Sequence, residues 1–154
     1  MKVVKLEAIT IRVPYKRVES SSLINRGGIT DVIVKITADN GLVGWGECTR
    51  AADTAGIESA VKVMAPLVVG RDPWDKEAMH RDLAVHAVWA FQPMTGNFAF
   101  AGIDMALWDL CGKQCGQPLY RMLGGAMRET VDYFYYMEWA TPAEFARRCL
   151  QTDA

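Results

Sequence analysis

The spacing of apolar residues predicts strands in the first third of the chain and helices after it. Residues 3–13 and 30–38 alternate between apolar and polar positions, which is typical of half-buried strands. Pro14 is expected to end the first strand. Residues 42–48 form a third strand, because the Asp-Asn-Gly turn at 39–41 supplies the positive φ that a tight hairpin needs. The pattern therefore predicts a three-stranded antiparallel meander.

Two features interrupt the simple alternation. In the first strand two apolar sets are one residue out of phase, as at a β-bulge: Val4, Leu6 and Ala8 form the first set, and Ile9, Ile11 and Val13 form the second. Residues 15–29 hold charges, three serines and two adjacent glycines, and they predict a loop. A connection of this length inside a compact domain is often functional.

Helical spacing begins after residue 50. Residues 54–65 suit a short helix, and Asp72 is expected to cap a second helix that has Pro73 at its first position. Residues 96–115 give the strongest helix, which ends at a Gly and a Pro in residues 116–118. A short helical piece then leads to two glycines at 124 and 125. Strands first and helices second predict an α+β domain, a meander followed by a helical bundle, over residues 1–125.

The pattern changes again in residues 126–154. Residues 130–138 are rich in aromatic side chains and predict a strand. Thr141 and Glu144 have the spacing of a capping box that opens another helix. We therefore expect these residues to be the first β/α unit of a second domain that the chain leaves incomplete.

The helix at 96–115 is apolar on nearly all sides, since only Asp104 and Asp109 are charged between Phe98 and Leu110. A three-stranded sheet covers one side of such a helix. Other helices of the chain or a missing second domain must cover the rest, and the unfinished β/α unit favours the second alternative. Asp104 is expected to pair with a neighbouring element, with a catalytic role as the alternative. Asp109 is expected to pair with Lys113 on the same helix.

Composition excludes several classes of protein. Of the 154 residues 51% are hydrophobic and 23% are charged, which is typical of a globular chain, and a net charge of −1 gives no attraction to nucleic acid or an anionic membrane. No segment approaches the ~20 apolar residues of a membrane span, and the N-terminus does not resemble a signal peptide. The four cysteines lack the spacing of a disulfide framework, so we expect free thiols and a cytoplasmic location.

Two stretches carry a resemblance to a known family. AGIDMALWDLCGK at residues 101–113, followed by QPLYRMLGG at 117–125, resembles the signature of the mandelate racemase/muconate-lactonising branch of the enolase superfamily. The strands around the Asp-Asn-Gly turn are similar to the same family's first sheet. The resemblance implies an α+β capping domain, a modified (β/α) TIM barrel, and Mg²⁺ as the cofactor. It also implies a base that removes the proton next to a substrate carboxylate.

The resemblance assigns no catalytic residue and no metal ligand to this chain, because residues 126–154 are far fewer than the ~250 of a barrel. It implies that residues 15–29 are a substrate-specificity loop, with candidate substrate contacts at the positions Ser20, Ser21, Ser22, Asn25 and Arg26. Thr49, in a second loop that follows the structural residue Glu47, is a further candidate. At the end of the first barrel strand, Met137 and Glu138 are candidates too.

The leading hypothesis is that the chain is the cap of an acid-sugar dehydratase, a lyase, and that it is inactive without its missing barrel. A racemase, epimerase or cycloisomerase of the same family, each an isomerase, is the alternative reaction. We expect a small carboxylate substrate and a homo-oligomer. Two other hypotheses are a stand-alone interaction module that binds another chain, and copies of this chain that rebuild a site between them.

Overall fold

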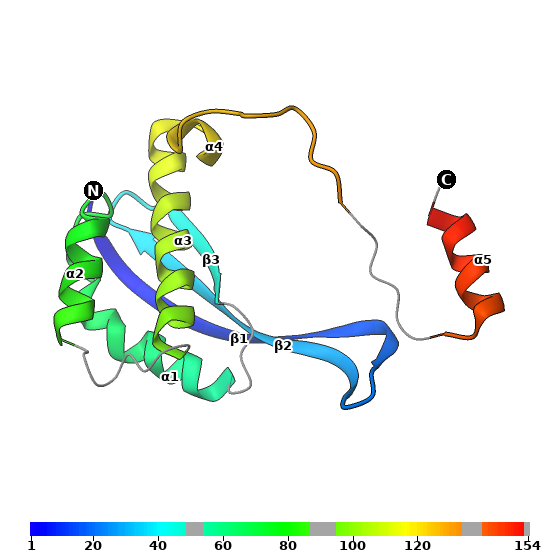
Figure 1. Ribbon diagram of the computed structural model, residues 1–154. Helices are drawn as coiled ribbons and strands as arrows, with labels where there is room; N and C mark the ends of the chain where they lie inside the picture. Colours follow the sequence, from blue (N-terminus) through cyan, green and yellow to red (C-terminus); the bar gives the residue numbers. More distant parts are fainter. Residues whose placement is uncertain (49–53, 87–94, 134–139, 153–154) are drawn as a thin grey trace. The chain divides into compact units, whose positions relative to one another are not determined.

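The computed structural model describes residues 1–48, 54–86, 95–133 and 140–152 (Figure 1). The chain divides into two compact units, Met1–Val13 with Thr30–Gly125 and Pro14–Ile29 with Ala126–Ala154. The elements run in the order β1 (Val3–Ser20), β2 (Asn25–Ala38), β3 (Val43–Cys48), α1 (Thr54–Met64), η1 (Ala65–Leu67), α2 (Lys76–His86), α3 (Thr95–Cys115), α4 (Leu119–Met122) and α5 (Pro142–Thr152). The first unit is the predicted α+β fold.

The sheet is the predicted meander, with strand order β1-β2-β3. β2 and β3 pair antiparallel in a register that places Ile33 opposite Glu47 and Lys35 opposite Trp45. The turn between them closes through the amide of Ala38, which donates to the carbonyl of Leu42 at 2.9 Å. Gly41 has a φ of 82°, as the Asn-Gly signal requires.

The loop predicted at residues 15–29 is wrong for most of its length. β1 continues through Pro14 to Ser20, and β2 starts at Asn25, so only the four residues between them form the turn. Pro14 does not end the strand because β1 lies at the edge of the sheet, where a missing amide hydrogen costs no ladder bond on the free side.

The phase slip predicted between Ala8 and Ile9 is wrong, because strict alternation continues through these residues. Leu6 and Ala8 pack against the core of the first unit, whereas Ile9 and Ile11 are 38% and 36% exposed. Because successive side chains of a strand point to opposite faces, Ile9 and Ile11 lie on the outer face of the sheet. The break in phase lies earlier, since Val3 and not Val4 is buried.

The second helix starts later than predicted. Asp72 does not cap it; the Asp72 carboxylate accepts a hydrogen bond from the amide of Trp74 at 3.0 Å and so fixes a turn. Helix α2 begins at Lys76, and the carbonyl of Asp75 accepts from the amide of Met79. The other boundaries in the first unit agree with prediction, including the long helix α3 and the Glu58–Lys62 pair on α1.

Helix α3 packs directly on β3 because glycines remove the side chains between them. A Cβ atom on Gly44 would lie 2.1 Å from the carbonyl oxygen of Ala106, and one on Gly46 would lie 1.9 Å from that of Gly102. Both obstacles are backbone atoms. The sequence Val-Gly-Trp-Gly in β3 therefore sets the distance between helix and sheet.

The predicted Asp109–Lys113 pair is confirmed at 2.6 Å, and it also closes the free edge of β3. The Trp45 amide donates to the Asp109 carboxylate at 2.8 Å, and the Lys113 ammonium donates to the carbonyl of Val43 at 2.8 Å. The Trp45 amide and the Val43 carbonyl therefore have hydrogen-bond partners, and they are not available for pairing with another strand.

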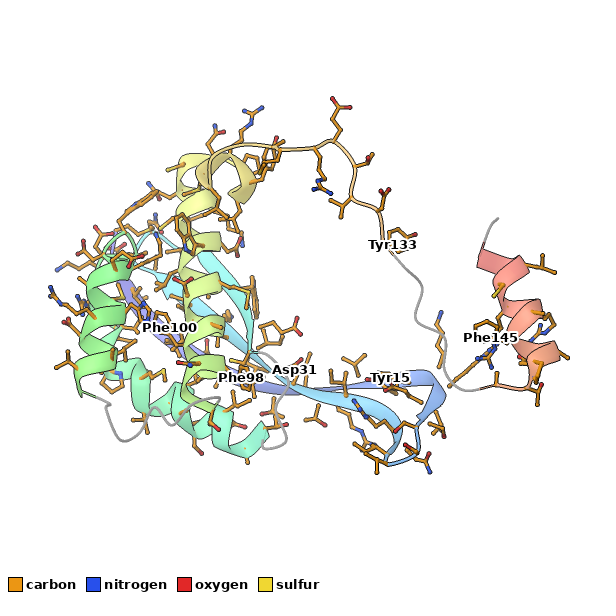
Figure 2. The ribbon with its side chains drawn as sticks, in the orientation of Figure 1. Tyr15, Asp31, Phe98, Phe100, Tyr133 and Phe145 are labelled. Atoms are coloured by element: carbon orange, nitrogen blue, oxygen red, sulfur yellow. The ribbon has the colours of Figure 1, made fainter. Side chains whose placement is uncertain are left out.

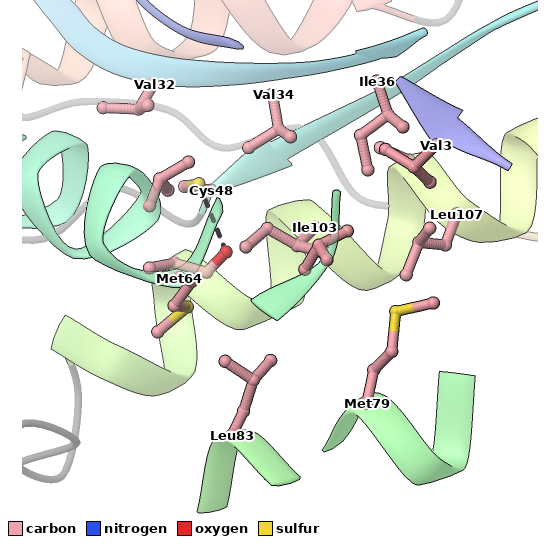
Figure 3. Close-up of a cluster of buried hydrophobic side chains, with 14 of the residues drawn as sticks. Val3, Val32, Val34, Ile36, Cys48, Met64, Met79, Leu83, Ile103 and Leu107 are labelled. Atoms are coloured by element: carbon pink, nitrogen blue, oxygen red, sulfur yellow. Dashed lines mark hydrogen bonds between the residues drawn. The ribbon is translucent and has the colours of Figure 1, made fainter. Parts of the chain in front are cut away.

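The core of the first unit lies between the inner face of the sheet and helices α1, α2 and α3 (Figures 1 and 3). Its largest fully buried side chains include Ile36, Ile57, Met79, Leu83, Ile103 and Leu107. Phe100, labelled in Figure 2, stacks on His80 of α2 with ring centroids 4.5 Å apart. The sheet and the two helices cover most of α3, but Met105 is 42% exposed. Part of its apolar surface is thus left uncovered within this unit.

After α3, the predicted glycine positions are confirmed but the predicted strand is only partly described. Gly116 has a φ of 62° and ends α3, and Gly124 and Gly125 follow α4 with φ values of 109° and 97°. The predicted strand at 130–138 is wrong for residues 130–133, which have no regular structure, and residues 134–138 lie outside the described part. A barrel strand is stable only when it pairs with neighbours, and the described strands all belong to the β1–β3 sheet.

The start of α5 is close to the predicted capping box. The Thr141 hydroxyl accepts from the amide of Glu144 at 3.4 Å, but the Glu144 carboxylate pairs with Arg147 and Arg148 instead of returning to Thr141. Among the helices that the structure describes, none is long and apolar enough to cross a membrane.

Candidate functional site

The tip of the β1–β2 hairpin is a four-residue turn held together by Ser21. Its amide donates to the carbonyl of Ile24 at 2.9 Å, and its hydroxyl accepts from the amide of Ile24 at 3.1 Å. Leu23, at the apex, is 90% exposed. The turn therefore has a backbone fixed by a serine and an apolar side chain at its end.

Two polar pairs cross the hairpin just behind this turn. The Ser20 hydroxyl donates to the Asn25 side-chain oxygen at 2.6 Å. The Arg26 Nε atom lies 3.9 Å from a Glu19 carboxylate oxygen, which is too long for a hydrogen bond. The structure thus brings three predicted residues onto adjacent positions of one hairpin, with Arg26 only loosely held.

Ser22, the remaining candidate in this segment, is exposed and makes no hydrogen bond to any residue that the structure describes. Glu19 is not among the predicted site residues, because a loop at residues 15–29 gives it no partner across a hairpin. Once the strands are extended to the turn, Glu19 faces Arg26 across the hairpin. The candidates Thr49, Met137 and Glu138 lie outside the described residues.

A second polar feature is a pair of acidic side chains on the outer face of β2 and β3. Glu47 hydrogen-bonds the side chain of Asp31, and this bond, together with the charge of Asp31, raises the pKa of Glu47. Asp31 is only 5% exposed, and its carboxylate accepts from the amide of Val32 at 3.0 Å. The prediction that Glu47 has a structural role has no direct test, but its partner Asp31 follows from the hairpin register. Asp31 lies two residues before Ile33, which is opposite Glu47.

Lys76, at the start of α2, lies in an aromatic cage formed by Trp74 and by Trp108 of α3. The Lys76 ammonium lies 3.9 Å from the Trp108 ring centroid and 5.0 Å from that of Trp74. It also donates to the Cys111 sulfur at 3.7 Å, and Lys76 is 7% exposed. Two indole faces and a sulfur acceptor compensate for burying this cation. The cage is a packing feature that holds α2 against α3.

The prediction that Asp104 pairs with a neighbouring element is wrong within the described part of the chain, where it makes no hydrogen bond or ion pair. Burial raises the pKa of Asp104, and the nearby charges of Lys76 and His80 oppose that rise. Its alternative, a catalytic role, stays a prediction. Burial also raises the pKa of Cys48, to about 11, so that thiol is not activated as a nucleophile.

The family resemblance implies Mg²⁺ in the intact enzyme, which requires a cluster of metal-ligating side chains. Among the described residues, no group of three or more His, Cys, Asp or Glu side chains is placed to hold a metal ion. Asp31 and Glu47 are bonded to each other and do not offer a third ligand. The described residues therefore do not fit Mg²⁺, and what the hairpin supplies is a set of hydrogen-bonding groups.

Comparison with known proteins identifies the family. Residues 6–124 match the mandelate racemase/muconate lactonizing enzyme N-terminal domain. A D-galactonate dehydratase family member of Streptomyces bingchenggensis is 38% identical over 122 residues, which cover 78% of this chain and 29% of that protein. The L-Ala-D/L-Glu epimerase of Bacillus subtilis is 35% identical over 153 residues, covering 95% of this chain and 40% of that protein.

A solved structure supports the same assignment. The crystal structure of a dipeptide epimerase from Enterococcus faecalis, complexed with Mg and the dipeptide L-Leu-L-Tyr, superposes with a TM-score of 0.85 at 25% identity. The match covers 99% of this chain and 43% of that one, so the chain spans less than half the length of these relatives. The chain belongs to the mandelate racemase/muconate lactonizing enzyme family of the enolase superfamily and carries its N-terminal α+β domain.

Proposed function

We propose that this chain is the capping part of a Mg²⁺-dependent enzyme that removes the proton next to a substrate carboxylate, with acid-sugar dehydration as the reaction. Residues 1–125 are the cap, and residues 126–154 are the start of the barrel. Relatives that are D-galactonate dehydratase family members support the choice of reaction, because several of them are 36–39% identical to this chain.

The observation that carries the proposal is the polar hairpin behind the Ser21 turn. It presents a hydroxyl at Ser20, an amide at Asn25 and a guanidinium at Arg26 on adjacent positions. A polyol carboxylate offers hydroxyl groups that exchange hydrogen bonds with the first two and a carboxylate that pairs with the third. Since the Arg26–Glu19 contact is loose, a substrate carboxylate competes with Glu19 for the guanidinium at small cost.

The uncovered flank of α3 supports a second domain. Met105 is exposed there, and near the end of α3 a hollow of about 380 Å³ is bordered by Trp108, Pro118 and Leu119 together with polar groups of the same region. A surface of this kind is a docking site for another domain. We infer that the barrel covers it and that the barrel supplies the base and the metal ligands. In that arrangement Mg²⁺ would stabilise the negative charge that develops when the proton is removed.

Epimerisation is the second candidate, and one observation favours it. The match to the Bacillus subtilis epimerase extends over 95% of this chain, beyond the cap, whereas the match to the Streptomyces dehydratase family member covers 78%. The same hairpin groups suit a dipeptide, whose carboxylate also pairs with Arg26. Cycloisomerisation is a third possibility within the family, and a stand-alone interaction module is the non-catalytic one.

The test uses two chimeras, in which residues 1–125 replace the N-terminal domain of each of these two relatives. We expect the dehydratase chimera to turn over an acid sugar with Mg²⁺, and Arg26→Ala to raise its KM about tenfold while Arg17→Ala, an exposed cation of the same hairpin, leaves it unchanged. Activity only in the epimerase chimera would instead select epimerisation, and two inactive but folded chimeras would select the interaction module.

The 154-residue chain alone is expected to be inactive and to bind no stoichiometric Mg²⁺. Isothermal titration calorimetry checks the second point, because tight one-to-one binding would contradict the assignment of the metal ligands to the barrel. Rebuilding of a site by several copies would appear as turnover by the purified chain. We further propose a cytoplasmic location, which is supported by the free thiols of Cys48, Cys111 and Cys115.

A further inference from the structure

Two acidic side chains, Asp31 of β2 and Glu47 of β3, are neighbours on the outer face of the sheet. Val32 and Cys48, the adjacent residues that point inward, are buried against the helices. Because Ile33 is directly opposite Glu47 and side chains alternate along a strand, Asp31 is the diagonal neighbour of Glu47 on the same face. A hydrogen bond joins the two side chains. The strand pairing therefore brings two acids, the acid pair, together at the end of β3.

The hydrogen bond within the acid pair requires a proton. An ionised carboxylate only accepts hydrogen bonds, so two carboxylates cannot bond to each other, whereas a carboxyl group that keeps its proton donates to its neighbour. Asp31, labelled in Figure 2, is 5% exposed, and its carboxylate also accepts from the amide of Val32 at 3.0 Å. Glu47 is exposed. Glu47 is therefore the donor whose proton water can remove.

No cation forms an ion pair with the acid pair within the part of the chain that the structure describes. The outer-face residues of β1 near this end are apolar: Ile9, Ile11 and Val13. Further along the sheet, Lys35 holds its ammonium 5.6 Å from the Trp45 ring centroid. On the inner face the Cys48 thiol stays neutral, because burial and the charge of Asp31 raise its pKa to about 11, and α3 meets this thiol with the backbone of Gly102. The shared proton is thus what keeps two negative charges from lying side by side.

From this geometry we propose that the acid pair is a pH-sensitive switch at the end of β3. While Asp31 and Glu47 share the proton, their hydrogen bond holds the end of β3 against β2. Loss of the proton breaks that bond and places like charges next to each other, which releases the strand end. Thr49, a predicted substrate contact, follows Cys48 directly in the chain. The inference concerns the sheet alone and does not rest on the proposed reaction.

The direction of the pH dependence follows from Glu47. Its hydrogen bond to Asp31, then the charge of Asp31 and burial, raise the pKa of Glu47 above the ordinary value of 4.5. Glu47 therefore binds its proton more tightly in the paired strands than in the released ones. The switch is closed at pH 4.5 and below, and it opens as pH rises through the raised pKa. Because solvent screens the exposed Glu47, the expected change is local opening and not unfolding of the domain.

Backbone amides of β3 can report this opening. The Trp45 amide points to the free edge of the sheet, where it donates to Asp109, so the amides of Gly44 and Cys48 point toward β2 by alternation. Cys48 lies next to the acid pair, whereas Gly44 lies near the other end of the same ladder, opposite Ile36. Gly44 is therefore an internal control for Cys48.

Amide hydrogen exchange of the 154-residue chain, followed by NMR from pH 4.5 until the Glu47 carboxyl resonance has fully titrated, tests the switch. After correction for intrinsic exchange, protection at Cys48 should fall by about tenfold or more, while protection at Gly44 stays constant. Glu47→Gln keeps a donor but has no proton to lose, so its Cys48 protection should not change with pH. Glu129→Gln, at an exposed glutamate outside the sheet, should behave like the wild type. Equal behaviour of Cys48 and Gly44 in the wild type, or a Glu47→Gln variant that still loses protection, would overturn the proposal.

Asp31→Asn keeps the test informative if Glu47→Gln perturbs the sheet. The new amide carries no charge and can donate to an ionised Glu47, so the pKa of Glu47 should fall from its raised value to 4.5 or below. The carboxyl resonance of Glu47 measures this shift. A Glu47 that already titrates at 4.5 in the wild type, or one whose titration is the same in Asp31→Asn, contradicts the shared proton.

Discussion

Replacing Gly46 by Ala tests whether backbone contact sets the distance between α3 and the sheet. The added Cβ would lie 1.9 Å from the Gly102 carbonyl oxygen and 2.8 Å from the Ala106 nitrogen, whereas ordinary contact begins near 3.4 Å. Helix α3 must therefore move away by about 1.5 Å, because no side-chain rotation can relieve a clash with backbone.

The loss in the free energy of unfolding comes from the gap that this movement opens between α3 and the sheet. A gap of ~0.5–1 Å already forfeits a quarter to a half of a van der Waals contact, and Val34, Ile103 and Leu107 all pack across this interface. Overpacking typically costs 1–3 kcal/mol, and a rigid obstacle points to the upper end. The lower entropy of unfolded Ala returns ~0.4–1 kcal/mol. We expect a net loss of about 2–3 kcal/mol in the free energy of unfolding, a large part of the usual ~5–15 kcal/mol.

Urea unfolding followed by tryptophan fluorescence measures this loss, since Trp45 and Trp108 report on the elements involved. Gly27→Ala is the control, because nothing lies within 4 Å of a Cβ at that position, and it should change stability by less than about 1 kcal/mol. If Gly46→Ala is too unstable to measure, Gly102→Ala provides a second route. Its Cβ would lie 2.5 Å from the Cys48 sulfur, so Cys48→Ala should partly rescue it. A Gly46→Ala protein within about 0.5 kcal/mol of wild type would refute the reasoning.

Three further predictions concern charged groups. Asp109→Ala should lower the free energy of unfolding by about 2 kcal/mol, measured in urea, because the Trp45 amide loses a charged acceptor; no loss would show that water replaces it. Burial raises the pKa of Asp104, so the folded state binds its proton more tightly than the unfolded state and loses stability as pH rises through that pKa. Asp104→Asn should therefore gain stability relative to wild type in thermal unfolding as pH rises above 3.8, the ordinary pKa of aspartate, and a constant difference would contradict this. Arg147 and Arg148 lower the pKa of Glu144 to about 2, so its carboxyl resonance should titrate there by NMR and move toward its ordinary pKa near 4.5 when both arginines are replaced by Gln.

Local pattern in the sequence was enough to predict most elements of the first unit. The Asn-Gly turn fixed the β2–β3 pairing, and the apolar run ended by Gly116 and Pro118 gave α3 almost to the residue. These signals are local, since they act between residues up to four or five apart, and they need no knowledge of the fold. The motif on α3 also led directly to the family.

The errors have a common physical origin. Pro14 and the serines of residues 15–29 have strong local preferences for a loop, but the edge position of β1 removes the penalty that would have ended the strand. Asp72 prefers a cap, and it instead serves a turn before Lys76, whose ammonium is caged by Trp74 and Trp108. In each case the position of the residue in the folded chain outweighed its local propensity.

For the candidate site, too, the sequence predicted the segment and the tertiary structure decided the contacts. The sequence by itself predicted substrate contacts within residues 15–29, because serines, an asparagine and an arginine gather there. Only the tertiary structure decided that Ser20 meets Asn25, that Arg26 faces Glu19, and that Asp31 meets Glu47. Such pairs depend on strand register, which is a property of the packed sheet and not of any one segment.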